Sequence, residues 1–260
     1  MIKRIIRLYR IYGTKKSFLF LFLAIYRFLF FYIRGSYSQD GADLLIDKLL
    51  GKKKTGFYVD IWANHPIKFS NTYRFYKKGW SGINIDANHG ILEKFKNKRK
   101  RDINLNFGIS DRYGYLTFWA FDPDVCSTFD KVLMKKCLKE GCKLVGKEKI
   151  RIFPLSSVLA KYALGKEIDF ISIDAEGFDL NVLKGNNWQK YRPKLICVET
   201  TERDEANINF FLTGHFYKEL YQTTNSRIYI DSKSEMLDSS PRDKNINLWL
   251  FYFFINYLLN

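Results

Sequence analysis

The 260-residue chain has few of the residues that build metal and disulfide scaffolds. It contains four cysteines without a Cys-x-x-Cys pair, and only three histidines. These counts argue against a structural zinc site and against a disulfide framework. Phosphate-binding loops are missing too, because neither Gly-x-Gly-x-x-Gly nor Gly-x-x-x-x-Gly-Lys-Ser/Thr occurs. A reducing environment is therefore the default expectation.

Acidic residues are absent from residues 1–39, which hold eight lysines and arginines and so carry half of the net charge of +16. Two further basic stretches, 94–101 and 131–149, are interpreted as solvated helix faces and loops. Nucleic-acid binding is the alternative, but the chain has no RNP-type, zinc-finger or helix-turn-helix pattern. Nucleic acid is therefore not expected as a partner.

The N-terminal charges flank an apolar run at 18–33 that only Arg27 interrupts. As a helix this run would be about 24 Å long, shorter than the ~30 Å hydrocarbon core of a bilayer. The pattern favours a basic, aromatic-rich helix within residues 1–34 that lies on an anionic membrane surface. A helix packed on the protein's own core and a membrane-spanning helix are the alternatives. We expect a cytoplasmic protein that is peripheral at the membrane.

The chain beyond residue 50 alternates between short apolar runs and helical patterns. Strands are expected at 57–60, 82–86, 104–109, 168–174 and 194–199, and helices at 70–78, 89–99, 156–163 and 178–184. Unbroken apolar runs are typical of strands buried on both faces of a parallel sheet. This order predicts an α/β fold with an N-terminal segment at 1–50 and a domain at 51–260. Later runs at 216–221, 228–230 and 247–254 predict further strands, with an antiparallel hairpin at the sheet edge.

Four of the expected strands finish in an acid, and the residues are Asp60, Asp86, Asp174 and Glu199. Ligands of open parallel sheets bind just outside the carboxyl ends of the strands. Acids on that rim of a basic protein favour a ligand with cationic groups and hydroxyls. The spacing of the first two acids is close to that at which nucleotide folds place an acid on a ribose diol. An adenosine ligand without phosphates fits, and S-adenosylmethionine is the candidate.

Several ordered blocks carry a resemblance to a known family. They are YSQDGADLL at 37–45, FYVDIWANHPIKFSNTYRFYKKGWSGINIDAN at 57–88, RDINLNFGISDRYG at 101–114, STFD at 127–130, DFISIDAEGFDLNVLKG at 169–185 and YRPKLICVE at 191–199. Together they resemble the FkbM family of S-adenosylmethionine-dependent methyltransferases. The resemblance implies a Rossmann-like class I methyltransferase fold, with a mostly parallel seven-stranded sheet whose last strand is antiparallel, and S-adenosylmethionine as cofactor.

One position departs from the family pattern. Such families usually carry glycine after Asp-Ile in the turn that follows the first strand, where the backbone approaches the cofactor. This chain has Trp62 there. Either the loop is re-routed so that the indole points away, or the protein has lost catalysis.

Methyl transfer to a hydroxyl requires alignment and removal of a proton. Asp174 and Glu176 are the leading catalytic candidates, because residues two apart project to the same side of an extended segment. One of them would face the acceptor hydroxyl, as a base or as a ligand to a divalent metal, with Glu199 as a further metal ligand. The alternative is that Glu176 only caps the helix starting near Phe178. His65 is an alternative base.

The remaining candidates are assigned to the cofactor. They are Asp60, Ala63, Asn64, Asn71, Thr72, Asp86, Ser110 and Asp111. For Asn71 and Thr72, capping of the next helix is an equal alternative.

These expectations combine into O-methylation of a hydroxyl on a glycan or glycolipid intermediate at the cytoplasmic membrane face. The glycan acceptor is only what the resemblance implies, whereas the expected location at the membrane is inferred from residues 1–34. A non-catalytic binding or scaffold protein is the competing class, favoured by Trp62. A weaker alternative is an RNA methyltransferase that uses the basic stretches, disfavoured by the lack of an Asn-Pro-Pro-Tyr-type block.

Overall fold

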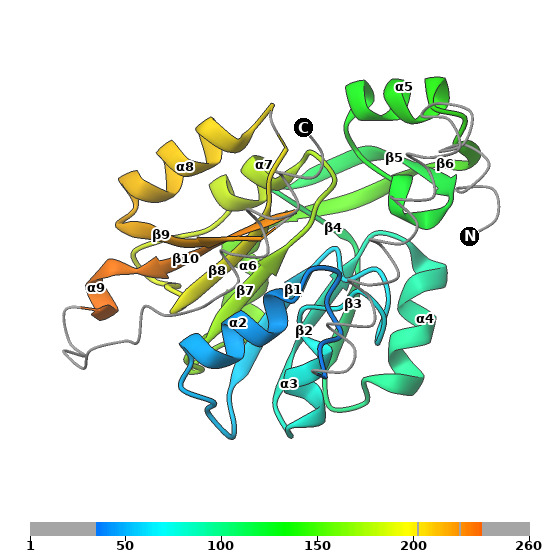
Figure 1. Cartoon of the computed structure of the whole chain (residues 1–260). Helices are drawn as coiled ribbons and strands as arrows, with labels where there is room; N and C mark the ends of the chain where they lie inside the picture. Colours follow the sequence, from blue (N-terminus) through cyan, green and yellow to red (C-terminus); the bar gives the residue numbers. More distant parts are fainter. Residues whose placement is uncertain (1–34, 202, 224, 236–260) are drawn as a thin grey trace, which may run out of the picture.

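The computed structural model describes residues 35–201, 203–223 and 225–235 (Figure 1). The predicted membrane-surface helix within residues 1–34 and the predicted strand at 247–254 lie outside the described residues. Within the described part of the chain, no helix is long and apolar enough to span a bilayer.

The body of the protein is a seven-stranded sheet in the order β3-β2-β1-β7-β8-β10-β9. Its strands are β1 (Phe57–Ile61), β2 (Ser81–Asp86), β3 (Ile103–Asn106), β7 (Phe170–Ile173), β8 (Leu195–Glu199), β9 (Tyr217–Gln222) and β10 (Ser226–Asp231). The first five run parallel, and β10 pairs antiparallel with both β8 and β9. The predicted α/β fold with an antiparallel last strand, including the C-terminal hairpin, is confirmed.

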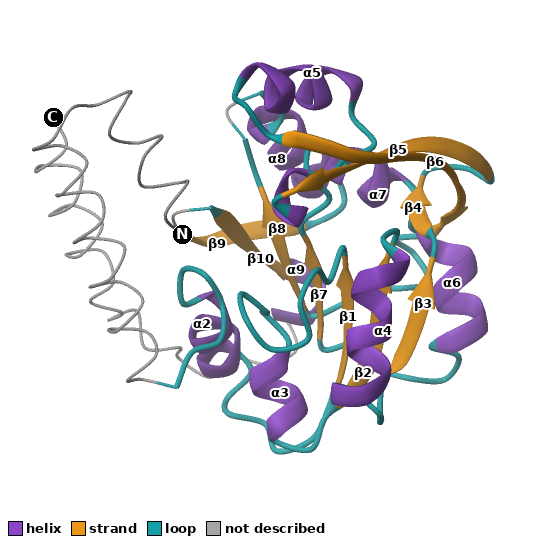
Figure 2. Cartoon of the chain, turned by 90° about the vertical axis from the view of Figure 1, so that its right-hand side faces the viewer, coloured by secondary structure: helices purple, strands orange, loops and turns teal. Residues whose placement is uncertain are grey.

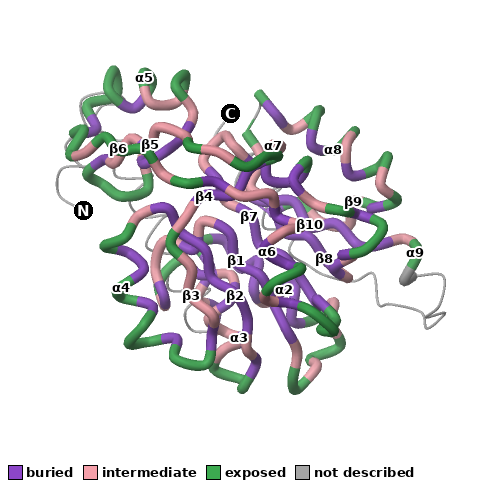
Figure 3. The backbone as a smooth tube through the Cα atoms, turned by 180° about the vertical axis from the view of Figure 1, so that it is seen from behind, coloured by how far each residue is buried: buried purple, intermediate pink, exposed green. Residues whose placement is uncertain are grey.

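Helices cover both faces of this sheet because successive strand residues point to opposite sides. On one face, Val59 of β1 packs in a cluster with Leu155 of α6 and Val182 of α7. On the other face, Tyr58 packs with helices α2 and α3. The helices are α2 (Ala42–Leu49), α3 (Tyr73–Lys77), α4 (His89–Lys98), α6 (Leu155–Tyr162), α7 (Asp179–Lys184), α8 (Glu205–Gly214) and α9 (Ser232–Glu235). The interior strands are consequently buried on both sides (Figure 3).

Helix α2 lies within the segment that the sequence analysis placed ahead of the domain. Its apolar face (Ala42, Leu45 and Ile46) is buried against Phe170 of β7 and Ile228 of β10. The packed body of the described structure therefore includes residues before 51.

A second sheet with three strands, ordered β4-β6-β5, lies next to the carboxyl ends of the main strands (Figure 2). It consists of β4 (Gly108–Ser110), β5 (Gly114–Asp122) and β6 (Lys143–Pro154), with the 3-10 turn η1 (Asp124–Cys126) and α5 (Lys131–Lys139) between β5 and β6. The expected strand at 104–109 is split, because β3 joins the main sheet and β4 joins this one. The basic stretch at 131–149 contains α5 and half of β6, whose residues are mostly exposed.

Candidate functional site

Three acidic side chains come together where β7 and β8 end. Asp174 directly follows β7, Glu199 is the last residue of β8, and Glu176 lies in the loop after β7. One carboxylate oxygen from each residue lies within 4.8 Å of the others. The two strands are parallel neighbours with Ile173 opposite Val198, so their carboxyl ends meet at one edge. We call Asp174, Glu176 and Glu199 the carboxylate cluster.

A tight turn, and not an extended segment, brings Glu176 to Asp174. Strand β7 stops at Ile173, Glu176 has φ 48° and Gly177 has φ 85°. The carboxylate of Asp179 fixes this turn by accepting the backbone N–H of Ala175 at 2.8 Å and that of Gly177 at 3.2 Å. The expected extended geometry was therefore wrong, although the two acids do meet.

Contacts from two other elements bear on the role of Glu176. The hydroxyl of Thr128, next to the second sheet, donates to the backbone carbonyl of Glu176 at 2.9 Å. Helix α7 begins at Asp179, and its N-cap residue is Phe178, so the helix has no side-chain cap. The carboxylate that accepts the backbone N–H groups ahead of α7 belongs to Asp179. The Glu176 carboxylate does not cap the helix and lies in the carboxylate cluster.

Burial is the largest cause that raises the pKa of every member of the carboxylate cluster, and repulsion by Asp174 adds to it for Glu176 and Glu199. The charged neighbours that shift these pKa values are themselves carboxylates, among them Asp40 and Asp179. A hydrogen bond between Asp174 and Glu199 requires that the pair share a proton. Among the described residues, the buried Oδ1 atom of Asp174 has no hydrogen-bond partner. No cation from this part of the chain is among the groups that shift the pKa values of the cluster.

Two more predicted acids lie at the ends of β1 and β2, and both are buried. Asp86 accepts the backbone N–H of Asn88 at 2.7 Å and of Asn64 at 2.9 Å, and burial raises its pKa to about 7. Asp60 accepts the hydroxyl of Thr72 at 2.6 Å, and burial raises its pKa to about 6. These contacts orient both carboxylates at the rim of the sheet.

Arg99 was missed because it lies in the basic stretch that was interpreted as a solvated helix face. Its side chain is 0% exposed, and its Nε atom pairs with Asp102 at 2.8 Å. Its Nη atoms donate to the carbonyl of Pro66 at 2.9 Å and, at 2.8 Å each, to Tyr58 and Thr72. Thr72 in turn donates to Asp60, so Arg99 holds both that acid and the loop after β1. No local sequence signal distinguishes Arg99 from its exposed neighbours.

The loop after β1 also contains His65, Ala63 and Asn64. His65 accepts two backbone N–H groups at Nδ1, from Ile67 at 3.0 Å and Lys68 at 2.9 Å. In the neutral ring this places the proton on Nε2, which favours a role in shaping the loop. Ala63 is buried in a small apolar cluster, and Asn64 has φ 51°.

The other cofactor candidates divide between the two sheets. Asn71 donates to the hydroxyl of Ser172 at 3.0 Å, next to the carboxyl end of β7. Thr72 occupies the N-cap position of α3 but its side chain makes no capping hydrogen bond, and the backbone of Tyr73 donates to the Ser70 hydroxyl at 3.1 Å instead.

Ser110 and Asp111 follow β4 in the second sheet. The Ser110 hydroxyl donates to the Asp111 carboxylate at 3.0 Å, and Asp111 also pairs with Arg112 at 3.3 Å. The structure therefore gives these two residues local partners and no hydrogen bond to Asp60 or Asp86 within the described residues.

Trp62 has φ 68°, a left-handed conformation that favours glycine. Its indole packs edge-on against Phe118 at 5.7 Å and Phe129 at 5.2 Å between ring centroids. The indole therefore has an aromatic packing site of its own next to the second sheet, as the re-routed loop requires.

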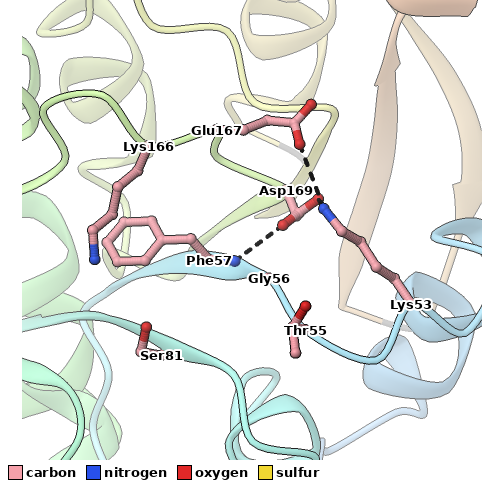
Figure 4. A pocket seen from close by; sticks show the side chains of 8 residues that line it. All are labelled: Lys53, Thr55, Gly56, Phe57, Ser81, Lys166, Glu167 and Asp169. Carbon is pink, nitrogen blue, oxygen red and sulfur yellow. Dashed lines mark hydrogen bonds and ion pairs between the residues drawn. The ribbon is translucent and has the colours of Figure 1, made fainter.

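A shallow recess at the opposite, amino ends of β1 and β7 has different chemistry (Figure 4). Lys53 pairs with Asp169 at 2.7 Å and with Glu167 at 3.4 Å. Asp169 also accepts the backbone N–H of Phe57 at 3.0 Å. The charges of the residues that line the recess neutralise one another, so we interpret the recess as a structural ion-pair network.

The strand order and the acids on the carboxyl rim are those of the class I methyltransferase fold. The sequence profile of the Methyltransferase FkbM domain matches residues 60–229. The chain therefore belongs to the FkbM methyltransferase family. No curated protein matches the chain by sequence.

Solved structures of methyltransferases resemble the chain at low identity. The METTL16 methyltransferase domain is 11% identical, with a TM-score of 0.44 over 73% of this chain and 66% of its own length. Precorrin-6y C5,15-methyltransferase from Geobacter metallireducens is 9% identical, with a TM-score of 0.40 over 72% and 85%. A putative RNA methyltransferase from Pyrococcus horikoshii is 9% identical, with a TM-score of 0.38 over 73% and 81%.

Proposed function

We propose that the chain transfers a methyl group from S-adenosylmethionine to a hydroxyl group of a sugar in a glycan or glycolipid. Family membership supports methyl transfer, and the carboxylate cluster is the observation that supports a hydroxyl acceptor. A neutral hydroxyl is a weak nucleophile, so the site must take its proton. Carboxylates with raised pKa values are stronger bases than solvated ones, and they lie at the edge where ligands of parallel sheets bind.

S-adenosylmethionine supplies a methyl group on a sulfonium, which is a good leaving group. The protein's own task is to align the acceptor and remove its proton. Asp174 is assigned to the acceptor, because its Oδ1 atom has no partner and accepts the hydroxyl hydrogen. The proton passes to the hydrogen-bonded pair of Asp174 and Glu199. Repulsion by Glu176 helps to keep the pKa of Glu199 high.

The residues at the ends of β1 and β2 fit the adenosine part. A carboxylate offers about four lone-pair sites, and Asp86 uses two of them for backbone N–H groups. The remaining sites would accept hydroxyls of the ribose. Asp60, Asn64 and Asn71 lie on the same rim and complete the assignment of the cofactor site.

The carboxylate cluster also fits a divalent cation. Oxygen ligands suit hard ions such as Mg²⁺, and Asp174 Oδ1 is without a partner. An ion held by Asp174, Glu176 and Glu199 would neutralise the cluster and acidify a bound hydroxyl. Treatment with EDTA distinguishes this arrangement from a shared proton alone. Loss of turnover with EDTA and its recovery with Mg²⁺ would support a bound ion, whereas unchanged turnover would support the shared proton.

A non-catalytic binding protein is the second candidate, and Trp62 is the observation that favours it. Calorimetric titration with S-adenosylmethionine separates the two candidates. Binding by the wild-type chain supports the enzyme. Binding gained only in Trp62→Gly would show a lapsed enzyme, and thermal unfolding of both proteins controls for the loss of indole packing.

The catalytic assignment is tested by Asp174→Asn. We expect turnover to fall by about 10²–10⁴-fold, the usual contribution of a general base. The assay follows transfer of labelled methyl groups from S-adenosylmethionine to envelope glycans extracted from cells that lack the gene. Glu148→Gln is the matched control, because it removes an exposed acid of β6. Activity of Asp174→Asn near that of the control would refute the assignment.

We further propose that residues 1–34 bring the domain to an anionic membrane surface, where lipid-linked glycans are available. The proposal is supported by the eight basic residues and the apolar run of this segment. Deletion of residues 1–34 is expected to abolish sedimentation with liposomes that contain anionic lipid. Unchanged sedimentation would refute it.

A further inference from the structure

Three of the four cysteines form a cluster that shares no residue with the carboxylate cluster. Cys126 ends the turn η1, Cys137 is in α5, and Cys142 lies between α5 and β6. Their sulfur atoms all lie within 4.8 Å of one another, and Cys126 Sγ is 2.9 Å from Cys142 Sγ. The spacing of the three residues along the chain matches no metal motif, so only the fold shows that they meet. We call them the cysteine cluster.

The surroundings of the cysteine cluster are apolar. Cys137 and Cys142 are buried with Phe121, and the partly buried neighbours are Trp119, Leu133 and Met134. Among the described residues, no histidine or carboxylate joins the three sulfurs as a further ligand. Hard ions such as Mg²⁺ and Ca²⁺ require oxygen ligands, whereas thiolates select soft ions such as copper(I) and zinc.

The number of sulfur atoms decides between the soft ions. Structural zinc sites are almost always four-coordinate, so three cysteines leave zinc one ligand short. Copper(I) accepts three thiolates in a plane. Three sulfurs at about 2.3 Å from a central ion would be about 4 Å apart. The sulfur spacing of the cluster, from 2.9 Å to at most 4.8 Å, brackets this value.

The scaffold of the cluster is compact and held by its own hydrogen bonds. Asp130 caps α5 by accepting the backbone N–H of Val132 at 2.6 Å and of Leu133 at 2.9 Å. The backbone of Cys142 donates to the carbonyl of Cys137 at 2.9 Å. The paired strands β5 and β6 anchor both ends of the segment (Figure 1). The sulfurs are thus preassembled, as a metal site requires.

A reversible disulfide is the competing use of these thiols. Thiol oxidation proceeds through the thiolate, which is favoured by neighbouring cations. Here burial and the neighbouring thiols raise the pKa of Cys126, and burial raises that of Cys137 to about 11. A disulfide would join only two of the three converging sulfurs, whereas a metal ion engages all three and displaces their protons when it binds.

We propose that Cys126, Cys137 and Cys142 bind one copper(I) ion through three thiolates. The site adjoins the carboxylate cluster along the chain, because Thr128 follows Cys126 by two residues and holds the carbonyl of Glu176. A bound ion would therefore fix the segment that supports the turn after β7. This inference is independent of the proposed methyl transfer.

The test is an anaerobic copper(I) titration of the full-length protein against bicinchoninate, followed by X-ray absorption. We expect one copper per chain with three sulfur neighbours at about 2.3 Å. Since even outer-shell changes lower metal affinity 10–100-fold, Cys137→Ser and Cys142→Ser should each weaken binding about 100-fold or more. Cys197→Ser is the matched control, because Cys197 is buried in β8 outside the cluster, and it should retain one copper.

Three outcomes would overturn the proposal. The first is a wild-type chain that retains no more copper than a Cys126→Ser, Cys137→Ser, Cys142→Ser triple variant. The second is tighter retention of zinc than of copper(I) in direct competition. The third is a disulfide between Cys126 and Cys142 in protein isolated under alkylating conditions. The wild-type measurements do not depend on the folding of any variant.

Discussion

Two groups of charged side chains sit on the same sheet, one buried around Arg99 and one partly buried in the carboxylate cluster, and they differ in how their charges are balanced. Around Arg99, the guanidinium faces the Asp102 carboxylate, and Tyr58 and Asn84 donate to the same acid. In the carboxylate cluster, the charged neighbours are other carboxylates, and Asp174 Oδ1 has no partner. The first arrangement is explained by folding alone. The second opposes folding, because buried like charges repel, and it requires a proton or a ligand for balance.

Thr72 connects the two groups. It accepts from Arg99 at 2.8 Å and donates to Asp60 at 2.6 Å. The balanced group therefore positions an acid at the rim beside the unbalanced one. The ion pair and hydrogen bonds around Arg99 stabilise the fold, and they also hold the rim next to the carboxylate cluster, which destabilises it.

The largest effect should come from breaking the balanced group with Arg99→Met. Removing one partner of a buried ion pair leaves the other charge unpaired and costs about 3–5 kcal/mol. Urea unfolding measures the loss. Lys98→Met is the control, because this neighbour is exposed and should change the free energy of unfolding by less than about 0.5 kcal/mol. A loss below about 1 kcal/mol in Arg99→Met would show that the ion pair does not stabilise the fold.

The next test applies one chemical change to both groups and expects opposite signs. Glu199→Gln removes a repelled charge and should stabilise the unliganded protein by about 1–2 kcal/mol. Asp102→Asn leaves Arg99 unpaired and should destabilise it by about 2 kcal/mol or more. Thermal unfolding without cofactor measures both variants. Equal signs would remove the distinction between the groups.

The sequence predicts the carboxylate rim better than the balanced group, for a physical reason. Asp174 and Glu199 end apolar runs, and the carboxyl ends of neighbouring parallel strands must converge. Arg99 is surrounded in the sequence by exposed lysines, and its burial depends on Tyr58 and Asp102 from other strands. The cysteine cluster and the second sheet were missed likewise, since β6 is largely exposed and lacks a long apolar run, and the three cysteines meet only through the fold of the segment between β5 and β6.

The unbalanced charges should also make stability depend on pH. Burial raises the pKa of Asp86 and Asp179 from 3.8 to about 7, so the folded state binds more protons than the unfolded state between these values. Stability is then fully present below about pH 4 and is lost as the pH rises through 7. At about 1.4 kcal/mol per pKa unit, each of these two groups can lower the free energy of unfolding by up to about 4 kcal/mol over that range.

Chemical denaturation at several pH values measures this slope. Glu199→Gln should flatten it, because it removes a group whose own pKa is raised by burial and by neighbouring carboxylates, and Glu148→Gln should leave it unchanged. A wild-type stability that rises from pH 4 to pH 7 would contradict the assignment of raised pKa values.

The smallest effect should come from the support of the turn at Glu176. Thr128→Val keeps the shape of the side chain but removes the hydroxyl that donates to the Glu176 carbonyl. The same hydroxyl accepts the backbone N–H of Asp130 at 2.8 Å, so two hydrogen bonds are lost. We expect a loss of about 1–2 kcal/mol in total, measured by urea unfolding. Thr117→Val in β5 is the matched control and should be nearly neutral, because β-branched residues are equivalent in strands. If the loss of turnover in Thr128→Val, converted to a free energy, exceeds its loss in free energy of unfolding, the second sheet positions the carboxylate cluster. Equal turnover and equal stability in Thr128→Val and Thr117→Val would show that the turn is held by Asp179 alone.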